Sequence, residues 1–221
     1  LSPYHNLLSR EERGGVPRLF VMDNIDPDTF AEMMRICPPK NTLFNVISKS
    51  GGTSETIAQF LIVLEELKRQ LPESKLKDHV VITTSPLAPK ATRTPLQELQ
   101  KQHDLPVFHI PLNVGGRFSI FTPVGLFPAA VMGMDIAAIV KGCRAMDKRT
   151  SKASLEENPA YLRAAVHYLL CQKKHKSIAV MMPYSDKLSA VSAWYAQLWA
   201  ESIGKIVPAT KDTPAHSVGQ T

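Results

Sequence analysis

The sequence predicts an α/β fold in which a parallel sheet is flanked by helices. Short, strongly apolar segments alternate along the chain with longer segments whose apolar residues recur at helical spacing. Strands this apolar are typical of a parallel sheet that is covered on both faces. Their alternation with helices indicates right-handed crossover connections. The 221 residues are 44% hydrophobic and 21% charged, which is enough for a sizeable core and excludes wholesale disorder.

Four apolar segments in the first half of the chain are expected to be the strands of this sheet. They lie at residues 18–23, 42–48, 79–84 and 106–112. A helix is predicted to begin at Asp26, because an Asp cap followed directly by proline is a common helix start.

The longest helix of this half is predicted from Thr53 to about Gln70. Its apolar residues recur along one face and are expected to point into the core: Ile57, Phe60, Leu61, Leu64 and Leu67. The segment 85–95 is rich in proline and threonine and is expected to be a loop.

The pattern changes after residue 115. Helices are predicted at about 135–145, 159–171 and 188–203, with one strand at 177–182. We interpret 1–150 as a first domain, 151–176 as a connecting helix and 177–221 as the start of a second α/β domain. One strand and one helix cannot form a sheet alone, and the chain does not begin with Met. We therefore expect it to be an internal piece of a longer protein.

The composition argues against several classes of function. The longest apolar stretch, residues 118–139, is interrupted by prolines and glycines, so no membrane span is expected. The three cysteines form no CxxC pair, which favours a reducing cytoplasm over a disulfide framework or a zinc site. The net charge of +6 is modest and not concentrated in a basic cluster, so nucleic acid is not an expected partner. A small phosphorylated substrate fits the positive balance.

Residues 47–56 (ISKSGGTSET) are the strongest chemical feature, because they run directly from a predicted strand into a predicted helix. The helix N-terminus offers N–H groups and a partial positive charge to an anion. The segment adds hydroxyl donors, an ammonium group and two glycines that allow close backbone approach: Ser48, Lys49, Ser50, Gly51, Gly52 and Thr53. Phosphate binding is the functional interpretation, and a plain Ser/Gly turn with a helix cap is the structural alternative.

Two further sets of residues are candidates for chemistry. Gly116 and Arg117 follow the strand at 106–112, at the sheet edge where ligands bind, and an arginine there can stabilise an anionic intermediate. Gln197 and Glu201 lie one helical turn apart, and a carboxylate in a cleft can act as a general base. A surface turn and a solvated helix face are the alternatives. His109 is expected to be a core residue of its strand.

In this order and spacing, ISKSGGTSET, NVGGRFS (113–119) and QLWAESIGK (197–205) resemble the phosphoglucose isomerase family, in particular its bacterial branch. The resemblance covers essentially the whole chain. It implies two sugar isomerase domains, each a parallel sheet flanked by helices. It also implies a homodimer without a metal or other cofactor, which interconverts glucose 6-phosphate and fructose 6-phosphate through an enediolate in glycolysis and gluconeogenesis.

The resemblance also implies roles for individual residues. Residues 48–53 would hold the phosphate, Gly116 and Arg117 would stabilise the enediolate, Gln197 would bind the substrate, and Glu201 would move the proton between C2 and C1. The family's catalytic His and Lys would fall beyond residue 221, so this chain alone is expected to show little or no isomerase activity. A non-catalytic sugar-phosphate-binding module is the alternative.

Overall fold

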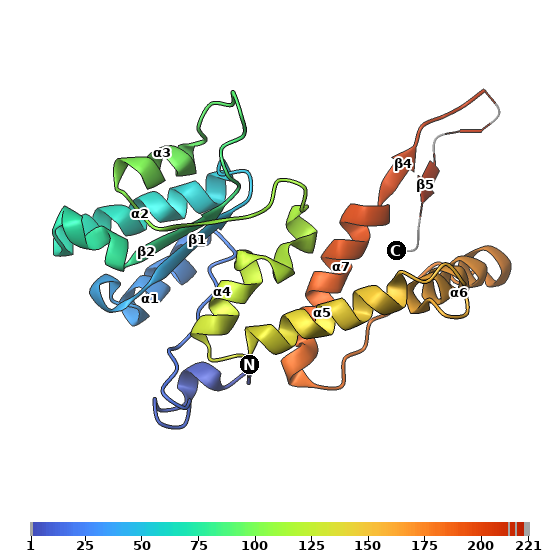
Figure 1. Cartoon of the computed structure of the whole chain (residues 1–221), viewed down its shortest axis with the longest axis horizontal. Coiled ribbons are helices and arrows are strands. Elements are labelled where there is room, and N and C mark those ends of the chain that lie inside the picture. Colours follow the sequence, from blue (N-terminus) through green and yellow to red (C-terminus); the bar gives the residue numbers. More distant parts are fainter. Residues whose placement is uncertain (1, 212, 215, 219–221) are drawn as a thin grey trace. The chain divides into compact units, whose positions relative to one another are not determined.

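The computed structural model describes residues 2–211, 213–214 and 216–218 and divides into two compact units. The sheet unit comprises Leu19–Met132, and the helical unit comprises Leu1–Arg18 together with Gly133–Thr221. Figure 1 shows the elements of both units in chain order. The domain boundaries expected at 150 and 176 stay predictions, and residues 212, 215 and 219–221 of the third predicted segment lie outside the described residues.

The sheet unit contains a parallel sheet of three strands in the order β1-β2-β3. These strands are β1 (Phe44–Ser48), β2 (Val80–Thr84) and β3 (Val107–His109). The central strand β2 is buried along its whole length, because it is paired on both edges. This confirms the predicted α/β fold with a parallel sheet flanked by helices, although β3 is shorter than the apolar segment that predicted it.

Four α-helices belong to the sheet unit: α1 (Pro27–Ile36), α2 (Ser54–Gln70), α3 (Pro95–Gln102) and α4 (Pro123–Val131). Short 3₁₀ helices accompany them at Pro39–Asn41, Glu73–Asp78 and Gly116–Phe121. Helix α1 begins as predicted, because the Asp26 carboxylate accepts hydrogen bonds from the N–H groups of Asp28 and Thr29.

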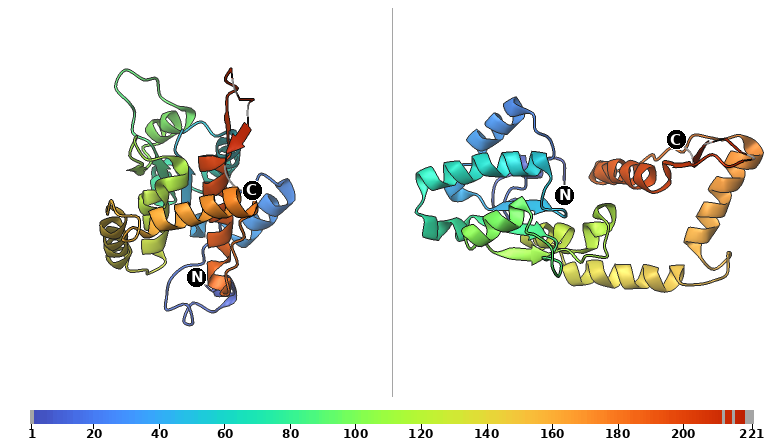
Figure 2. Two further views of the ribbon diagram at one scale, coloured as in Figure 1. Left: turned by 90° about the vertical axis from the view of Figure 1, so that its right-hand side faces the viewer. Right: turned by 90° about the horizontal axis from the view of Figure 1, so that it is seen from above.

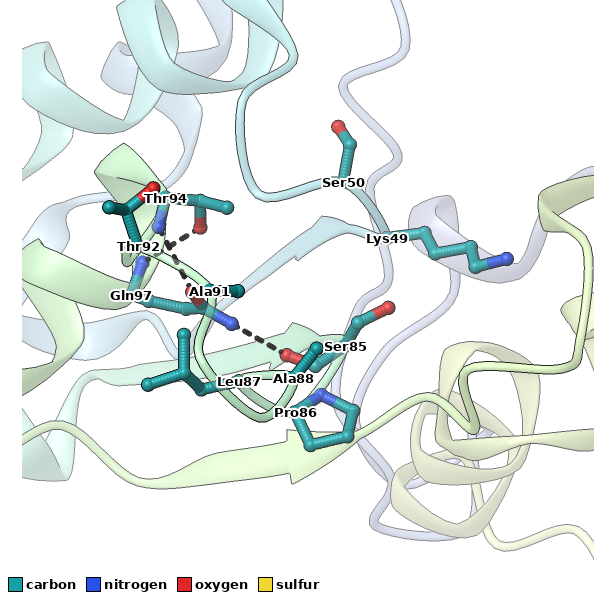
Figure 3. Close-up of a pocket in the computed structure, with 10 residues that line it drawn as sticks. All are labelled: Lys49, Ser50, Ser85, Pro86, Leu87, Ala88, Ala91, Thr92, Thr94 and Gln97. Carbon is teal, nitrogen blue, oxygen red and sulfur yellow. Dashed lines mark hydrogen bonds between the residues drawn. The ribbon is translucent and has the colours of Figure 1, made fainter.

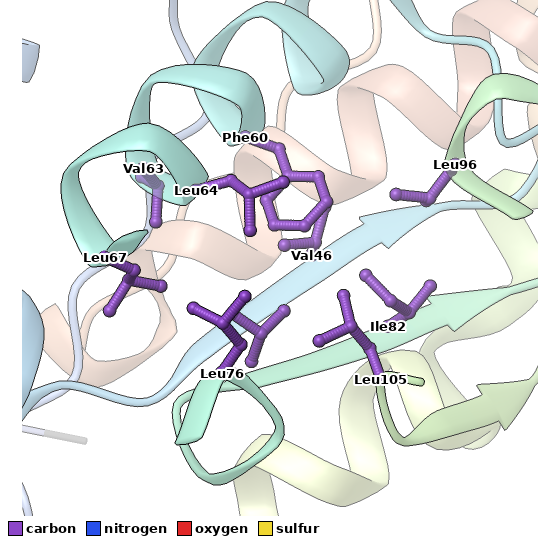
Figure 4. Close-up of a cluster of buried hydrophobic side chains, with 10 residues drawn as sticks. Val46, Phe60, Val63, Leu64, Leu67, Leu76, Ile82, Leu96 and Leu105 are labelled. Atoms are coloured by element: carbon purple, nitrogen blue, oxygen red, sulfur yellow. The ribbon is translucent and has the colours of Figure 1, made fainter. Parts of the chain in front are cut away.

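One face of the sheet packs on α2 and α3 and forms the core (Figure 4). Its buried members come from β1, β2 and the segments that connect the strands: Val46, Phe60, Val63, Leu64, Leu67, Leu76, Val80, Ile82, Leu96 and Leu105. Of the predicted stripe on α2, Phe60, Leu64 and Leu67 are buried, whereas Leu61 is 47% exposed. Val63 is buried and Leu61 is not, so the buried face of α2 is turned slightly about the helix axis from the predicted one.

The opposite face of the sheet is covered by α4. Residues alternate between the two faces of a strand, so Thr83 and its register partner Phe108 point away from α2. The ring of Phe108 contacts the ring of Phe127 in α4 at 5.0 Å between centroids. Thr83 is as fully buried as Ile82, and its hydroxyl donates to the Asn45 side-chain oxygen at 2.9 Å.

Two predicted strands, at 18–23 and 177–182, were wrong. Neither segment belongs to a sheet among the described residues, and the apolar side chains of Val21, Ile178 and Val180 are 72–74% exposed. A strand exists only where its backbone N–H and C=O groups find a neighbouring strand. An apolar pattern is therefore not enough by itself, and nothing in the described part of the chain pairs with these two segments.

The helical unit contains α5 (Ile136–Thr150), α6 (Pro159–Lys174) and α7 (Ser189–Ile203). Short elements accompany them: 3₁₀ helices at His5–Leu7 and Asp186–Leu188, and an antiparallel pair of β4 (Lys205–Val207) with β5 (His216–Val218). Figure 2 shows the three α-helices following one another rather than closing into a bundle. None of the three contains a buried residue.

Helices α6 and α7 nevertheless contact each other through ring pairs. The rings of His167 and Trp199 lie 5.6 Å apart, and the Arg163 guanidinium lies 4.9 Å from the Tyr195 ring and donates to its hydroxyl.

No helix in the described part of the chain is long and apolar enough to cross a membrane.

Replacing Leu67 by Ala should destabilise the sheet unit by about 2–5 kcal/mol, because the cavity opens in a fully buried cluster. Leu61→Ala on the same helix is the matched control, since Leu61 is 47% exposed. Urea denaturation followed by circular dichroism gives both values. Equal losses for the two variants would contradict this description of the core.

Candidate functional site

Three hydroxyl groups converge where β1 passes into α2. Ser48 is the last residue of β1 and Thr53 is the N-cap of α2. The Ser48 and Thr53 hydroxyl oxygens lie 2.9 Å apart, and the Ser50 hydroxyl oxygen lies 3.4 Å from the first and 3.3 Å from the second. We call residues 48–53 the phosphate loop and these three side chains the hydroxyl cluster. The sequence singled out all six residues of this turn as a candidate phosphate site, and that they bind phosphate stays a prediction.

The N-cap of α2 does not use its side chain in the usual way. At the other α-helices whose N-cap has a polar side chain, that side chain accepts from a first-turn N–H group: Asp26, Thr94, Thr122, Asp135 and Asn158. Thr53 makes no such bond, because its hydroxyl is engaged with Ser48 and Ser50. The first N–H groups of α2 thus lack a side-chain cap, which is the arrangement that suits a bound anion.

Gly51 gives the loop its sharp turn. Its φ is +66°, and a Cβ at this position would come within 2.2 Å of the Thr94 hydroxyl oxygen. Both the conformation and the space therefore require glycine. At Gly52 a Cβ would meet no atom within 4 Å. The backbone N–H of Gly51 donates to the Ser48 hydroxyl at 3.1 Å, and that of Gly52 donates to the Ser50 hydroxyl at 3.3 Å.

One side of the phosphate loop is buried and the other is open to solvent. Ser48 and Gly51 are buried, Lys49 is half-buried, and Ser50, Gly52 and Thr53 are exposed. A pocket of about 420 Å³ lies between Lys49 and Ser50 on one side and the loop 85–94 with Gln97 on the other (Figure 3). The loop is thus fixed at its base and accessible to a ligand at its rim.

The Gly116–Arg117 pair begins a 3₁₀ helix that follows β3. Two hydroxyl-to-carbonyl bonds of 2.6 Å hold this turn, one from Ser119 to Gly116 and one from Thr122 to Ser119. The Arg117 guanidinium lies 5.1 Å from the Phe118 ring, which is a cation–π contact. The turn follows the carboxyl end of a parallel strand, as the phosphate loop does, and this is the edge where ligands commonly bind in parallel sheets.

Gln197 and Glu201 face each other on α7, as their spacing predicted. The Gln197 amide donates to a Glu201 carboxylate oxygen at 2.8 Å, and both side chains are exposed. They belong to the helical unit, whereas the phosphate loop and Arg117 belong to the sheet unit. That the two sets form one site stays a prediction.

Sequence analysis missed three residues that support the phosphate loop. The Thr84 hydroxyl donates to the Ser48 carbonyl at 2.6 Å, and Thr94 and Gln97 form a capping box at the start of α3. The signal for α3 was Thr94-Pro95-x-Gln97, the pattern of a capped helix start at the end of the segment expected to be a loop.

The prediction that His109 is a core residue was wrong, because its side chain is exposed at the end of β3.

Among the described residues, no three His, Cys, Asp or Glu side chains gather in a way that could hold a metal ion.

Comparison with known proteins places these features in one family. The family model described as phosphoglucose isomerase matches residues 4–221. A glucose-6-phosphate isomerase of Carboxydothermus hydrogenoformans is 47% identical over 91% of this chain and 42% of its own length. One from Rubrobacter xylanophilus is 39% identical over 99% of this chain and 48% of its own length. The chain thus spans less than half the length of these curated relatives.

Solved structures show the same likeness. A crystal structure of a hypothetical protein from Thermus thermophilus is 36% identical with a TM-score of 0.77, covering 92% of this chain and 46% of that one. A crystal structure of a glucose-6-phosphate isomerase from Chlamydia trachomatis is 28% identical with a TM-score of 0.73, covering 89% of this chain and 37% of that one.

Gly51→Ala should cost about 1–3 kcal/mol of stability, because the new methyl group meets both an unfavourable φ and the Thr94 side chain. Gly52→Ala is the matched control and should stay within about 0.5 kcal/mol of the parent. Thermal and urea unfolding measure both. A Gly51→Ala protein as stable as the parent would show that the turn at residue 51 is not the one described.

Proposed function

The chain belongs to the phosphoglucose isomerase family, and on this premise we propose that the protein interconverts glucose 6-phosphate and fructose 6-phosphate. The phosphate loop anchors the phosphate group of either sugar. Arg117 and the backbone at Gly116 stabilise the negative charge that develops on the sugar oxygens. Glu201 transfers the proton between C2 and C1, and Gln197 orients the substrate.

The observation that carries the proposal is the unused cap at the N-terminus of α2. Thr53 has the side chain to cap the helix but bonds to Ser48 instead, at 2.9 Å. A phosphate seated there would accept from the first-turn N–H groups and from exposed hydroxyls of the cluster. The Lys49 side chain, which lines the neighbouring pocket, adds a positive charge.

The remaining roles follow from the chemistry of aldose–ketose isomerisation. A base removes a proton from C2 of the aldose and returns it to C1, and the intermediate is an enediolate with negative charge on oxygen. The carboxylate of Glu201 can carry that proton, and the permanently charged Arg117 guanidinium can stabilise the oxyanion. Phosphate anchoring supplies binding energy remote from the reacting carbons, which holds C1 and C2 in place.

Three further features of the proposal come from the family rather than from the geometry. We propose that the protein works as a homodimer in the cytoplasm and needs no metal or other cofactor. Size-exclusion chromatography with light scattering tests the homodimer, and activity after dialysis against a chelator tests the independence from metal.

Fructose 6-phosphate should bind to the chain and raise its melting temperature in proportion to ligand affinity. Inorganic phosphate should raise it less, and fructose not at all, because the loop recognises the phosphate group. Thr53→Ala should weaken fructose 6-phosphate binding about tenfold through loss of one hydrogen-bonding hydroxyl. A folded chain with equal shifts for fructose and fructose 6-phosphate would argue against a phosphate site in this loop.

Glu201→Gln in the intact gene product should slow the exchange of the C1 and C2 protons with solvent by roughly 10²–10⁴-fold, because the amide cannot accept the proton. Affinity for fructose 6-phosphate should change little. NMR in deuterated water measures the exchange, and Glu156→Gln, at another exposed carboxylate of the helical unit, is the control. Parallel loss of binding and exchange would make Glu201 a structural residue. Exchange that is unchanged in Glu201→Gln would show that another group transfers the proton, and no exchange above the uncatalysed rate in the intact parent would favour a non-catalytic sugar-phosphate-binding module.

A further inference from the structure

We propose that Gln97 is a positioning residue for the phosphate loop: its side-chain amide fastens together the two ends of the segment 85–94, and those ends hold the loop's backbone. The inference rests on the proposed function for the identity of the ligand. Gln97 lies outside the phosphate loop, and its amide groups bond to backbone partners.

Both polar atoms of the Gln97 amide are engaged with the backbone. The amide nitrogen donates to the Ser85 carbonyl at 2.9 Å, and the amide oxygen accepts from the Thr94 N–H at 3.0 Å (Figure 3). Ser85 directly follows β2 and Thr94 directly precedes α3. One side chain therefore bridges the two ends of a ten-residue loop, in addition to the packing of α3 on the sheet.

The two ends that Gln97 fastens are themselves bonded to the phosphate loop. The Ser85 N–H donates to the Lys49 carbonyl at 3.3 Å, and the Leu96 N–H donates to the Gly51 carbonyl at 3.0 Å. The Thr94 side chain lies against Gly51, where a Cβ would not fit. The backbone carbonyls of Lys49 and Gly51 are thus held by Ser85, at one end of the clamped segment, and by Leu96, two residues beyond its other end.

Holding these two carbonyls also fixes the direction of the next N–H groups of the loop, and with them the path of the backbone that leads into α2. A peptide unit is planar, and in the trans form its C=O and N–H point in opposite directions. The Lys49 carbonyl shares its peptide plane with the Ser50 N–H, and the Gly51 carbonyl shares its plane with the Gly52 N–H. With the carbonyls tied toward the 85–96 segment, both N–H groups point to the other side, where the Gly52 N–H meets the Ser50 hydroxyl.

Gln97→Leu is the test, with Gln100→Leu as its matched control. Gln100 lies one turn further along α3, is likewise half-buried, and also donates its amide to a backbone carbonyl, that of Leu105 at 2.7 Å. Both variants lose a side-chain-to-backbone bond of one helix. Only Gln97 is connected to the phosphate loop, so the pair separates positioning from general stability.

We expect Gln97→Leu to weaken binding of fructose 6-phosphate and of inorganic phosphate about five- to tenfold, measured by calorimetry well below the melting temperature. In the intact gene product KM should rise by a similar factor with little change in kcat, because anchoring rather than chemistry is affected. Gln100→Leu should leave both affinities unchanged. Equal affinities for Gln97→Leu and the parent, or equal losses in both variants, would overturn the proposal.

Hydrogen exchange tests the clamp independently of any ligand. In the absence of ligand, Gln97→Leu should exchange the Ser85 and Leu96 amide hydrogens about tenfold faster than the parent, whereas Gln100→Leu should not. Gln97→Glu keeps the acceptor for Thr94 but places an acceptor against the Ser85 carbonyl, so it should reproduce the faster exchange at Ser85. Unchanged exchange would overturn the clamp. Faster exchange in a variant whose parent binds no sugar phosphate would leave the clamp standing and remove the proposed function.

Discussion

The turn at Gly51 is the constraint on which the rest of the candidate site depends. Its positive φ reverses the chain between β1 and α2 within a few residues, and the Thr94 side chain fills the space that a Cβ would need. The Leu96 N–H in the first turn of α3 also donates to the Gly51 carbonyl, so the start of α3 supports this turn. That start is set by the capping box of Thr94 and Gln97, so a local feature of one helix determines the shape of a loop more than forty residues earlier in the chain.

The parallel sheet is what brings these distant segments together. With the strand order β1-β2-β3, the carboxyl ends of all three strands meet at one edge. Thr84 ends the central strand and its hydroxyl bonds to the Ser48 carbonyl that ends β1, while the Ile110 N–H bonds to the Thr84 carbonyl beyond the end of β3. The polar groups of the edge are thus satisfied by neighbouring strands, and the hydroxyls of Ser50 and Thr53 stay at the surface.

The sequence was informative wherever structure is decided locally. The Asp26 cap, the helical stripe of α2 and the glycine turn at Gly51 each depend on residues within a few positions of one another, and they are found where they were predicted. Segments 18–23 and 177–182 failed for the opposite reason, because a strand depends on a partner that the sequence does not identify. Helix α3 was not predicted, because proline and threonine are also common in loops. Here Thr94 and Pro95 form the start of the helix. The role of Thr84 depends on the register of β1 and β2, which no local pattern contains.

In the proposed function the phosphate anchor and the general base come from different units of the chain, whereas Arg117 of the sheet unit also acts in the chemistry and Gln197 of the helical unit also orients the substrate. The phosphate loop is built on the buried cluster of the sheet unit, so its geometry depends on packing, on the Thr84 hydroxyl and on the start of α3. Glu201 lies on α7, a helix without buried residues, in the helical unit. Interactions made equally with substrate and transition state lower KM, and only those that strengthen in the transition state raise kcat. In the proposed isomerase a change that loosens only the phosphate loop therefore acts mainly on KM, whereas loss of the Glu201 carboxylate acts mainly on kcat.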